Sequence, residues 1–200
     1  MLCELNLKDH KYVIIMQGPQ YSGKSTLAGK IKTVAGQGMC EVVSADDHFT
    51  TINADGMASY KFVGSELPAA HHECFSHFCK AIVDGKRLIV VDNTNADYLN
   101  YVRTARLATR AAYKIIVIQL VCENVQLLIQ RGWRSLHSVP DFAIERTIKS
   151  IQEPKLEDSG VVKITGFLGE DIAVNSKKPR FVTLTSNPIP RLAKMKEQGF

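Results

Sequence analysis

The segment 18–25 reads Gly-Pro-Gln-Tyr-Ser-Gly-Lys-Ser and fits the pattern G-x-x-x-x-G-K-[ST]. Its glycines allow backbone N–H groups to turn inward around phosphate oxygens, and the helix expected after it adds a partial positive charge. A lysine in this position reaches the β- and γ-phosphates, and the following hydroxyl can ligate Mg²⁺. We therefore predict a site for ATP, or another nucleoside triphosphate, with Mg²⁺. The nucleotide contacts predicted within it are Gly18, Tyr21, Ser22, Gly23, Lys24, Ser25 and Thr26.

Acidic side chains follow two of the predicted strands. Asp46 and Asp47 come after one strand, and Asp92 comes after the next. Phosphoryl transfer to a hydroxyl needs one carboxylate to orient the acceptor and take its proton, and another to hold the metal ion. We predict Asp46 as the catalytic base, assisted by Lys24, and Asp92 as a metal ligand beside Ser25. The structural alternatives are an Asx turn at Asp46 and a helix cap at Asp92, and we expect Asp47 to be a capping residue.

A basic segment, Arg131-Gly132-Trp133-Arg134, lies between two predicted helices. Mobile arginine segments of this kind close over a triphosphate and neutralise the charge that develops during transfer. We predict that Arg131 and Arg134 contact the nucleotide and that Arg134 takes part in catalysis. The alternative is a solvated connection between helices.

Strands and helices must alternate to bring these groups together. β-rich runs at 12–16, 41–44, 88–91 and 115–121 alternate with helical patterns at 24–35, 68–83, 97–112, 124–130 and 141–152. This order predicts an α/β fold, a P-loop NTPase three-layer sandwich with a mostly parallel central sheet. In such a sheet, ligands bind at the carboxyl ends of the strands, where the P-loop and the two acidic positions fall. We expect residues 50–65 to form a loop.

The alternation of predicted strands and helices becomes less regular after about residue 153. We expect a P-loop kinase domain over residues 1–155 and an extension over 156–200 that packs on the same domain. Within the extension, 161–165 and 181–185 have strand-like composition.

Composition narrows the class of protein. The 200 residues are 45% hydrophobic and 22% charged, as in ordinary globular domains, and the formal net charge of +5 mildly favours an anionic partner. The five cysteines are scattered, which argues against a disulfide framework, and the longest apolar runs are too short to cross a bilayer. We therefore expect a soluble cytoplasmic, or otherwise intracellular, protein without a membrane partner.

Together these motifs resemble the polynucleotide-kinase-like family of P-loop kinases, which includes the phage 5′-hydroxyl polynucleotide kinase and the kinase-like domain of the brain cyclic-nucleotide phosphodiesterase. The matching segments, in the family's order, are 18–25, 44–49, Ala70-His71 with Cys74, 92–95 and 131–140. The resemblance implies that Asp46 is the general base and Arg134 the lid arginine. It also implies that Asp92 and Asn95 shape the metal and acceptor side of the site.

Two departures from the family pattern bear on function. Gln20 and Tyr21 stand where related loops have a Pro-Gly step, and His48-Phe49 replaces an arginine expected to bind a polynucleotide phosphate. Three hypotheses follow: a kinase for the 5′-hydroxyl of RNA or DNA, a kinase for a nucleoside, nucleotide or sugar-nucleotide, and a non-catalytic nucleotide-binding module. For the first, Arg103, Arg106 and Arg110 share one helical face that could follow a single-stranded nucleic acid, although a solvated face is the better explanation.

Overall fold

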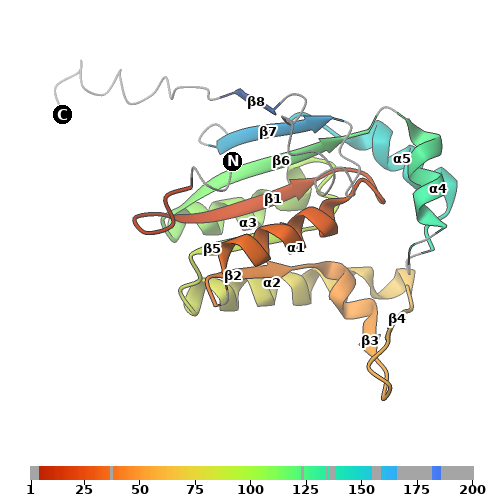
Figure 1. The fold of residues 1–200 in the computed structure, drawn as a ribbon, viewed down its shortest axis with the longest axis horizontal. Helices are drawn as coiled ribbons and strands as arrows, with labels where there is room; N and C mark the ends of the chain where they lie inside the picture. Colours follow the sequence, from red (N-terminus) through yellow and green to blue (C-terminus); the bar gives the residue numbers. More distant parts are fainter. Residues whose placement is uncertain are drawn as a thin grey trace.

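The computed structural model describes residues 5–36, 38–122, 124–133, 135 and 138–154, together with the backbone of strands 159–165 and 182–185. Figure 1 shows one twisted sheet with helices on both of its faces. The predicted α/β sandwich with a mostly parallel sheet is therefore confirmed. Arg134, which the sequence analysis placed in the site, lies outside the described residues.

The central sheet has the strand order β2-β5-β1-β6-β7-β8. All neighbouring strands are parallel except β8, which pairs antiparallel with β7. β1 thus lies between two strands that follow it in sequence, which creates the switch point where ligands bind in open α/β sheets. The strands are β1 (Lys11–Gln17), β2 (Cys40–Val43), β5 (Leu88–Asp92), β6 (Tyr113–Val121), β7 (Ser159–Thr165) and β8 (Val182–Thr185).

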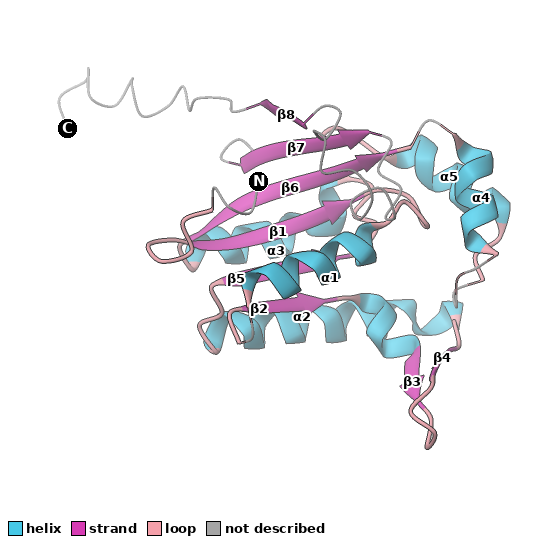
Figure 2. Ribbon diagram, viewed as in Figure 1, coloured by secondary structure: helices cyan, strands magenta, loops and turns pink. Residues whose placement is uncertain are grey.

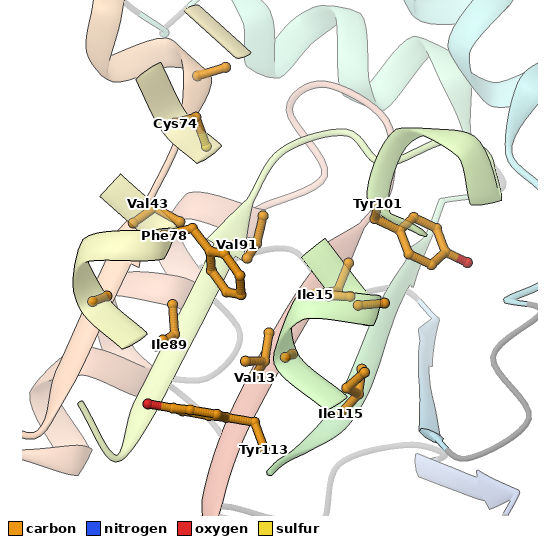
Figure 3. Packing of buried hydrophobic residues seen from close by; sticks show 14 of the residues in the cluster. Val13, Ile15, Val43, Cys74, Phe78, Ile89, Val91, Tyr101, Tyr113 and Ile115 are labelled. Atoms are coloured by element: carbon orange, nitrogen blue, oxygen red, sulfur yellow. The ribbon is translucent and has the colours of Figure 1, made fainter. Parts of the chain in front are cut away.

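The central position of β1 explains its uninterrupted apolar sequence. Six of its seven residues are buried, because helices cover both faces of a parallel sheet. Successive side chains alternate between two cores, with Val13 and Ile15 in one cluster and Ile14 and Met16 in the other. Figure 3 shows the first cluster, where Phe78 and Tyr101 from two helices close over the strand residues.

Three long helices form the outer layers of the sandwich. α1 covers the core that contains Ile14, whereas α2 and α3 cover the core that contains Val13. Figure 2 shows α4 and α5 beyond the carboxyl end of β6. Among the described residues, no helix is long and apolar enough to cross a membrane. The helices are α1 (Lys24–Ala35), α2 (Leu67–Val83), α3 (Tyr98–Arg110), α4 (Val125–Gly132) and α5 (Asp141–Ser150).

Residues 50–65 are more ordered than we expected from the sequence. Thr50–Ile52 (β3) and Ala58–Tyr60 (β4) form a small antiparallel hairpin, and Gly64–Glu66 (η3) form a 3₁₀ turn before α2. These strands have three residues each, which is too short for the period-2 signal of a strand to be recognised in the sequence. The expectation of loop there was wrong. The hairpin matters because it carries Tyr60 to the edge of the site.

A cluster of buried amides joins the carboxyl ends of β1 and β6 to the loop after β5. Gln17 Nε2 donates to the carbonyl of Asn95 at 2.9 Å and to that of Gln152 at 3.1 Å. Gln119 Nε2 donates to Gln17 Oε1 at 2.9 Å. Asn95, with a left-handed φ of 46°, donates from Nδ2 to the carbonyl of Met16 at 2.7 Å. These bonds fix the loop 92–95 at the edge where the site lies.

We expect replacement of Gln17 by leucine to destabilise the fold, because the Asn95 carbonyl and the Gln119 amide would lose a partner in a buried position. The predicted loss is about 1–3 kcal/mol in the free energy of unfolding, measured by urea denaturation. The matched control is Gln126→Leu on the exposed surface of α4, with a change within about 0.5 kcal/mol. Equal effects of the two substitutions would contradict a supporting role for the amide cluster.

Candidate active site

The phosphate loop spans residues 18–23, between β1 and α1. An added Cβ at Gly18 would lie 2.9 Å from the carbonyl oxygen of Leu120, so a side chain there would force the loop away from β6. Gly18 N–H donates to the carbonyl of Thr94 at 3.1 Å, which connects this loop to the loop after β5. Gly23, with a left-handed φ of 95°, precedes α1 and has no side chain to occupy the first amide groups of that helix. Those amide N–H groups are free to donate hydrogen bonds to a bound anion such as a phosphate.

Lys24 begins α1 and lies among acidic groups. Its Nζ donates to the carbonyl of Pro19, across the phosphate loop, at 2.7 Å. Burial lowers the pKa of Lys24, while the charges of Asp92 and then Asp46 oppose that shift. The ammonium group therefore lies between the phosphate loop and the two carboxylates, and its contact with nucleotide phosphates stays a prediction.

Asp92 ends β5 and is 6% exposed. Burial raises the pKa of its carboxyl, and the charge of Lys24 and a hydrogen bond from the Ser25 side chain oppose that shift. Among the described residues, Asp92 Oδ1 has no hydrogen-bond partner although it is buried. A buried carboxylate oxygen without a partner, next to a hydroxyl, is a donor set that suits a hard cation such as Mg²⁺. The residues predicted as metal ligands are therefore adjacent and chemically suitable.

Asp46 and Asp47 lie on a short 3₁₀ helix, η2 (Ala45–Phe49), with different roles. Ser44 caps this helix: its hydroxyl accepts from Asp46 N–H at 3.2 Å, and its own N–H donates to Asp47 Oδ2 at 3.3 Å. The expectation that Asp47 is a capping residue is thus confirmed. Asp46 instead accepts a hydrogen bond on Oδ1 from the hydroxyl of Tyr60 at 3.0 Å.

The ends of β2 and β5 are also joined directly. Ser44 Oγ donates to the carbonyl of Asp92 at 2.8 Å, and Ala45 N–H donates to Asn93 Oδ1 at 2.9 Å. These two bonds set the separation of Asp46 from Asp92, because each acidic residue lies within two positions of a bonded group. The predicted base and the predicted metal ligand are consequently held on one rigid edge.

A cavity of about 590 Å³ opens beside these groups. Lys24, Ser25, Asp46 and Asp92 all contribute to its wall. Asn95 lines it too, although its amide is bonded to the backbone of β1. Thr26 is exposed in the first turn of α1 and is not part of the wall, so its contact with nucleotide stays a prediction.

The wall of this cavity also contains residues that the sequence analysis missed. Tyr60 and Phe62 come from the hairpin segment, and Phe142 and Arg146 come from α5. His71, which matched the family pattern, also lines it from α2. Only the i, i+4 spacing of Phe142 and Arg146 on a predicted helix was visible in the sequence, and that spacing occurs on most helices.

Arg131 contacts the phosphate loop, as the lid hypothesis requires. Its Nη1 donates to the carbonyl of Tyr21 at 3.1 Å. Arg103, by contrast, stacks on the ring of Phe75 with its guanidinium carbon 3.8 Å from the ring centre. Of the three arginines proposed to follow a nucleic acid, Arg103 thus has a structural contact of its own, and none of the three lines the cavity.

The strand order, the phosphate loop at the switch point and the carboxylates beside it define a P-loop kinase-like domain. A family model described as an AAA domain matches residues 13–154, and the chain belongs to this family. No curated protein matches this sequence.

Solved structures share the fold at low identity. Kti12 of Chaetomium thermophilum in complex with ADP-AlF3 matches 77% of this chain and 89% of that chain, at 16% identity and a TM-score of 0.54. The APS kinase CysC of Mycobacterium tuberculosis, in complex with AMPPNP and APS, matches 82% and 96%, at 16% identity and a TM-score of 0.51. A chain of the Pnkp1/Rnl/Hen1 RNA repair complex matches over 72% of this chain and 44% of that chain, at 17% identity and a TM-score of 0.52. At these identities the likeness establishes the fold alone.

We expect Lys24→Ala to weaken the binding of Mg²⁺–ATP about 10- to 100-fold, since a charge-assisted contact to the phosphates would be lost. Isothermal titration calorimetry measures this change. The control is Lys32→Ala, also on α1, where the exposed ammonium pairs with Glu41 at 3.6 Å. Unchanged affinity in Lys24→Ala would remove the phosphate loop from nucleotide binding.

Proposed function

We propose that this protein is an ATP-dependent phosphotransferase that phosphorylates the 5′-hydroxyl of RNA or DNA. The observation that carries the proposal is that Lys24, Ser25, Asp46 and Asp92 line one cavity. A P-loop alone serves many nucleotide-binding proteins. A second carboxylate that lines the same cavity is what transfer to a hydroxyl requires.

Each of these residues has a defined part in the proposed reaction. Lys24 and the amides of the phosphate loop bind the β- and γ-phosphates, and Ser25 and Asp92 would hold Mg²⁺, which neutralises phosphate charge when bound. Asp46 takes the proton of the acceptor hydroxyl as the new O–P bond forms. The bond between the γ-phosphorus and the bridging oxygen breaks, and ADP leaves. The Tyr60 hydroxyl orients the Asp46 carboxylate for this step.

Aromatic and basic side chains that line the cavity support a nucleic-acid acceptor. Phe62 and Phe142 are 54% and 71% exposed and both border the cavity, so their rings are available to stack on bases. Arg146 adds a positive charge on the same side, and it is exposed. That charge can bind the phosphate following the 5′-terminal nucleoside, a contact that His48-Phe49 does not supply. The RNA repair complex among the structures with this fold is consistent with such an acceptor.

A small-molecule acceptor is the second candidate, and the size of the cavity favours it. About 590 Å³ lies within the range of pockets that bind small ligands, and the APS kinase with this fold was solved with AMPPNP and APS. Radiolabelled γ-phosphate offered with 5′-hydroxyl oligonucleotides, nucleosides and sugar-nucleotides distinguishes the two. Labelling of small molecules alone would overturn the nucleic-acid proposal.

We expect Asp46→Asn to reduce turnover about 10²- to 10⁴-fold while leaving ATP affinity close to that of the wild type, because only the proton acceptor is lost. Steady-state kinetics at saturating ATP and calorimetry measure the two quantities. The comparison variant, Asp47→Ala, removes the capping contact and should lower stability by about 1 kcal/mol with a smaller effect on turnover. If Asp47→Ala loses more turnover than Asp46→Asn, at a temperature where both variants are folded, Asp46 is not the catalytic base.

Arg146→Ala should weaken the binding of a short 5′-hydroxyl oligonucleotide and reduce the slope of log affinity against log salt by about one, since one phosphate contact disappears. Fluorescence anisotropy at several salt concentrations gives the slope. Lys149→Ala is the matched control, because Lys149 is exposed on the same helix and does not line the cavity. The same change of slope in both variants would contradict a phosphate contact by Arg146, because any positive charge on α5 would then have the same effect on oligonucleotide binding.

A further inference from the structure

The phosphate loop contains a residue in an unfavourable backbone conformation. Tyr21 has a φ of 61°, in the left-handed region that large side chains rarely adopt. Such conformations cost about 1–3 kcal/mol and persist where surrounding contacts impose them. The contacts of the Tyr21 side chain therefore show what this conformation achieves.

Several of those contacts are made with one segment of the molecule, from α4 to the start of α5, which we call the arm (residues 125–141, of which 125–133, 135 and 138–141 are described). The hydroxyl of Tyr21 accepts a hydrogen bond from Val139 N–H at 2.9 Å. The ring packs directly on Gly132, where an added Cβ would lie 2.6 Å from Tyr21 Cε2. The same ring borders the small core of Leu128, Ile129 and Ile144.

The backbone of Tyr21 makes a further contact with the arm. Its carbonyl accepts from Arg131 Nη1 at 3.1 Å, so the guanidinium lies next to the phosphate loop. The side chain thus contacts the arm immediately after Arg131 and again at Val139, and the backbone holds Arg131 itself. A glycine in position 21 would permit the same φ at lower cost but would leave only the backbone contact.

We propose that Tyr21 is a positioning residue that clamps the arm onto the phosphate loop and so holds Arg131 beside the phosphates of a bound nucleotide. The inference rests on the proposed function and adds a determinant of nucleotide retention to it. An unclamped arginine on a mobile segment would lose conformational entropy each time it bound phosphate, whereas a clamped one has already been ordered. Gly132 is the counterpart of Tyr21 in this clamp, because any side chain at position 132 would displace the ring.

The clamp predicts faster nucleotide release when the ring is removed. In Tyr21→Gly, we expect a fluorescent ATP analogue to dissociate about tenfold faster in stopped-flow measurements, from the loss of one hydrogen bond and one packing contact. Turnover should fall as well, because Arg131 is then held only by its bond to the backbone carbonyl at position 21. Tyr21→Phe keeps the ring and loses only the bond to Val139, so its effect on release should be smaller than that of Tyr21→Gly.

Double substitution tests the pairing of Tyr21 with Gly132. Gly132→Ala should accelerate release as Tyr21→Gly does, and Tyr21→Gly/Gly132→Ala should be no faster than Tyr21→Gly alone, since the clash needs the ring. Gly29→Ala on α1, where an added Cβ meets nothing within 4 Å, is the matched control for a glycine replaced in a helix. Effects that multiply in the double variant, or a wild-type release rate in Tyr21→Gly, would overturn the clamp.

A readout without nucleotide or acceptor separates this inference from the proposed function. The Val139 amide should exchange its hydrogen faster in Tyr21→Phe than in the wild type, because Tyr21 Oη is its acceptor. Faster exchange in a protein that labels no acceptor would retain the clamp and remove the proposed transfer. Unchanged exchange at Val139 would reject the clamp even if the protein is a kinase.

Discussion

The electrostatic attraction between Lys24 and Asp92 is the interaction on which the rest of the site depends. Burial lowers the pKa of Lys24 and raises the pKa of Asp92, and in each case the charge of the other residue is the main influence that opposes the shift. Replacing Lys24 by a neutral residue would leave the buried Asp92 carboxylate without its main opposing charge, and an uncompensated buried charge is strongly destabilising. The fold therefore has to hold α1 and β5 in register, and the same register brings Ser25 to the Asp92 carboxylate.

Several polar contacts maintain that register at the carboxyl edge of the sheet. The buried amides of Gln17 and Gln119 connect β1, β6 and the loop after β5. Ser44 and Asn93 connect β2 to β5. Hydrophobic burial alone would keep the strands together, but it is non-directional and would not fix where each strand ends. Directional bonds at the strand ends are what give Asp46 and Asp92 a defined separation.

The sequence predicts where the phosphate loop and the two carboxylates lie in the fold, because the signals for both are local. The P-loop motif depends on glycine conformations and charge within eight residues, and the strands that carry Asp46 and Asp92 are short apolar runs whose carboxyl ends meet in any parallel sheet. The positions of the other residues that line the cavity could not be predicted in this way. Tyr60 and Phe62 reach it through a hairpin of two three-residue strands, and Arg146 reaches it only because α5 folds back over the site. Those placements are tertiary, and no period in the sequence encodes them.

The same contrast explains why the sequence predicted Tyr21 only as a nucleotide contact and not as a partner of the arm. A tyrosine where related loops have glycine signals a departure, but the sequence does not say what lies above it. The structure supplies Gly132 and Val139 as its neighbours, more than a hundred residues away along the chain. A bulky residue in a left-handed conformation is tolerated when its side chain gains contacts that a glycine could not make. In the arrangement we propose, a phosphate loop that already holds the arm in place needs less binding energy from the nucleotide to order it.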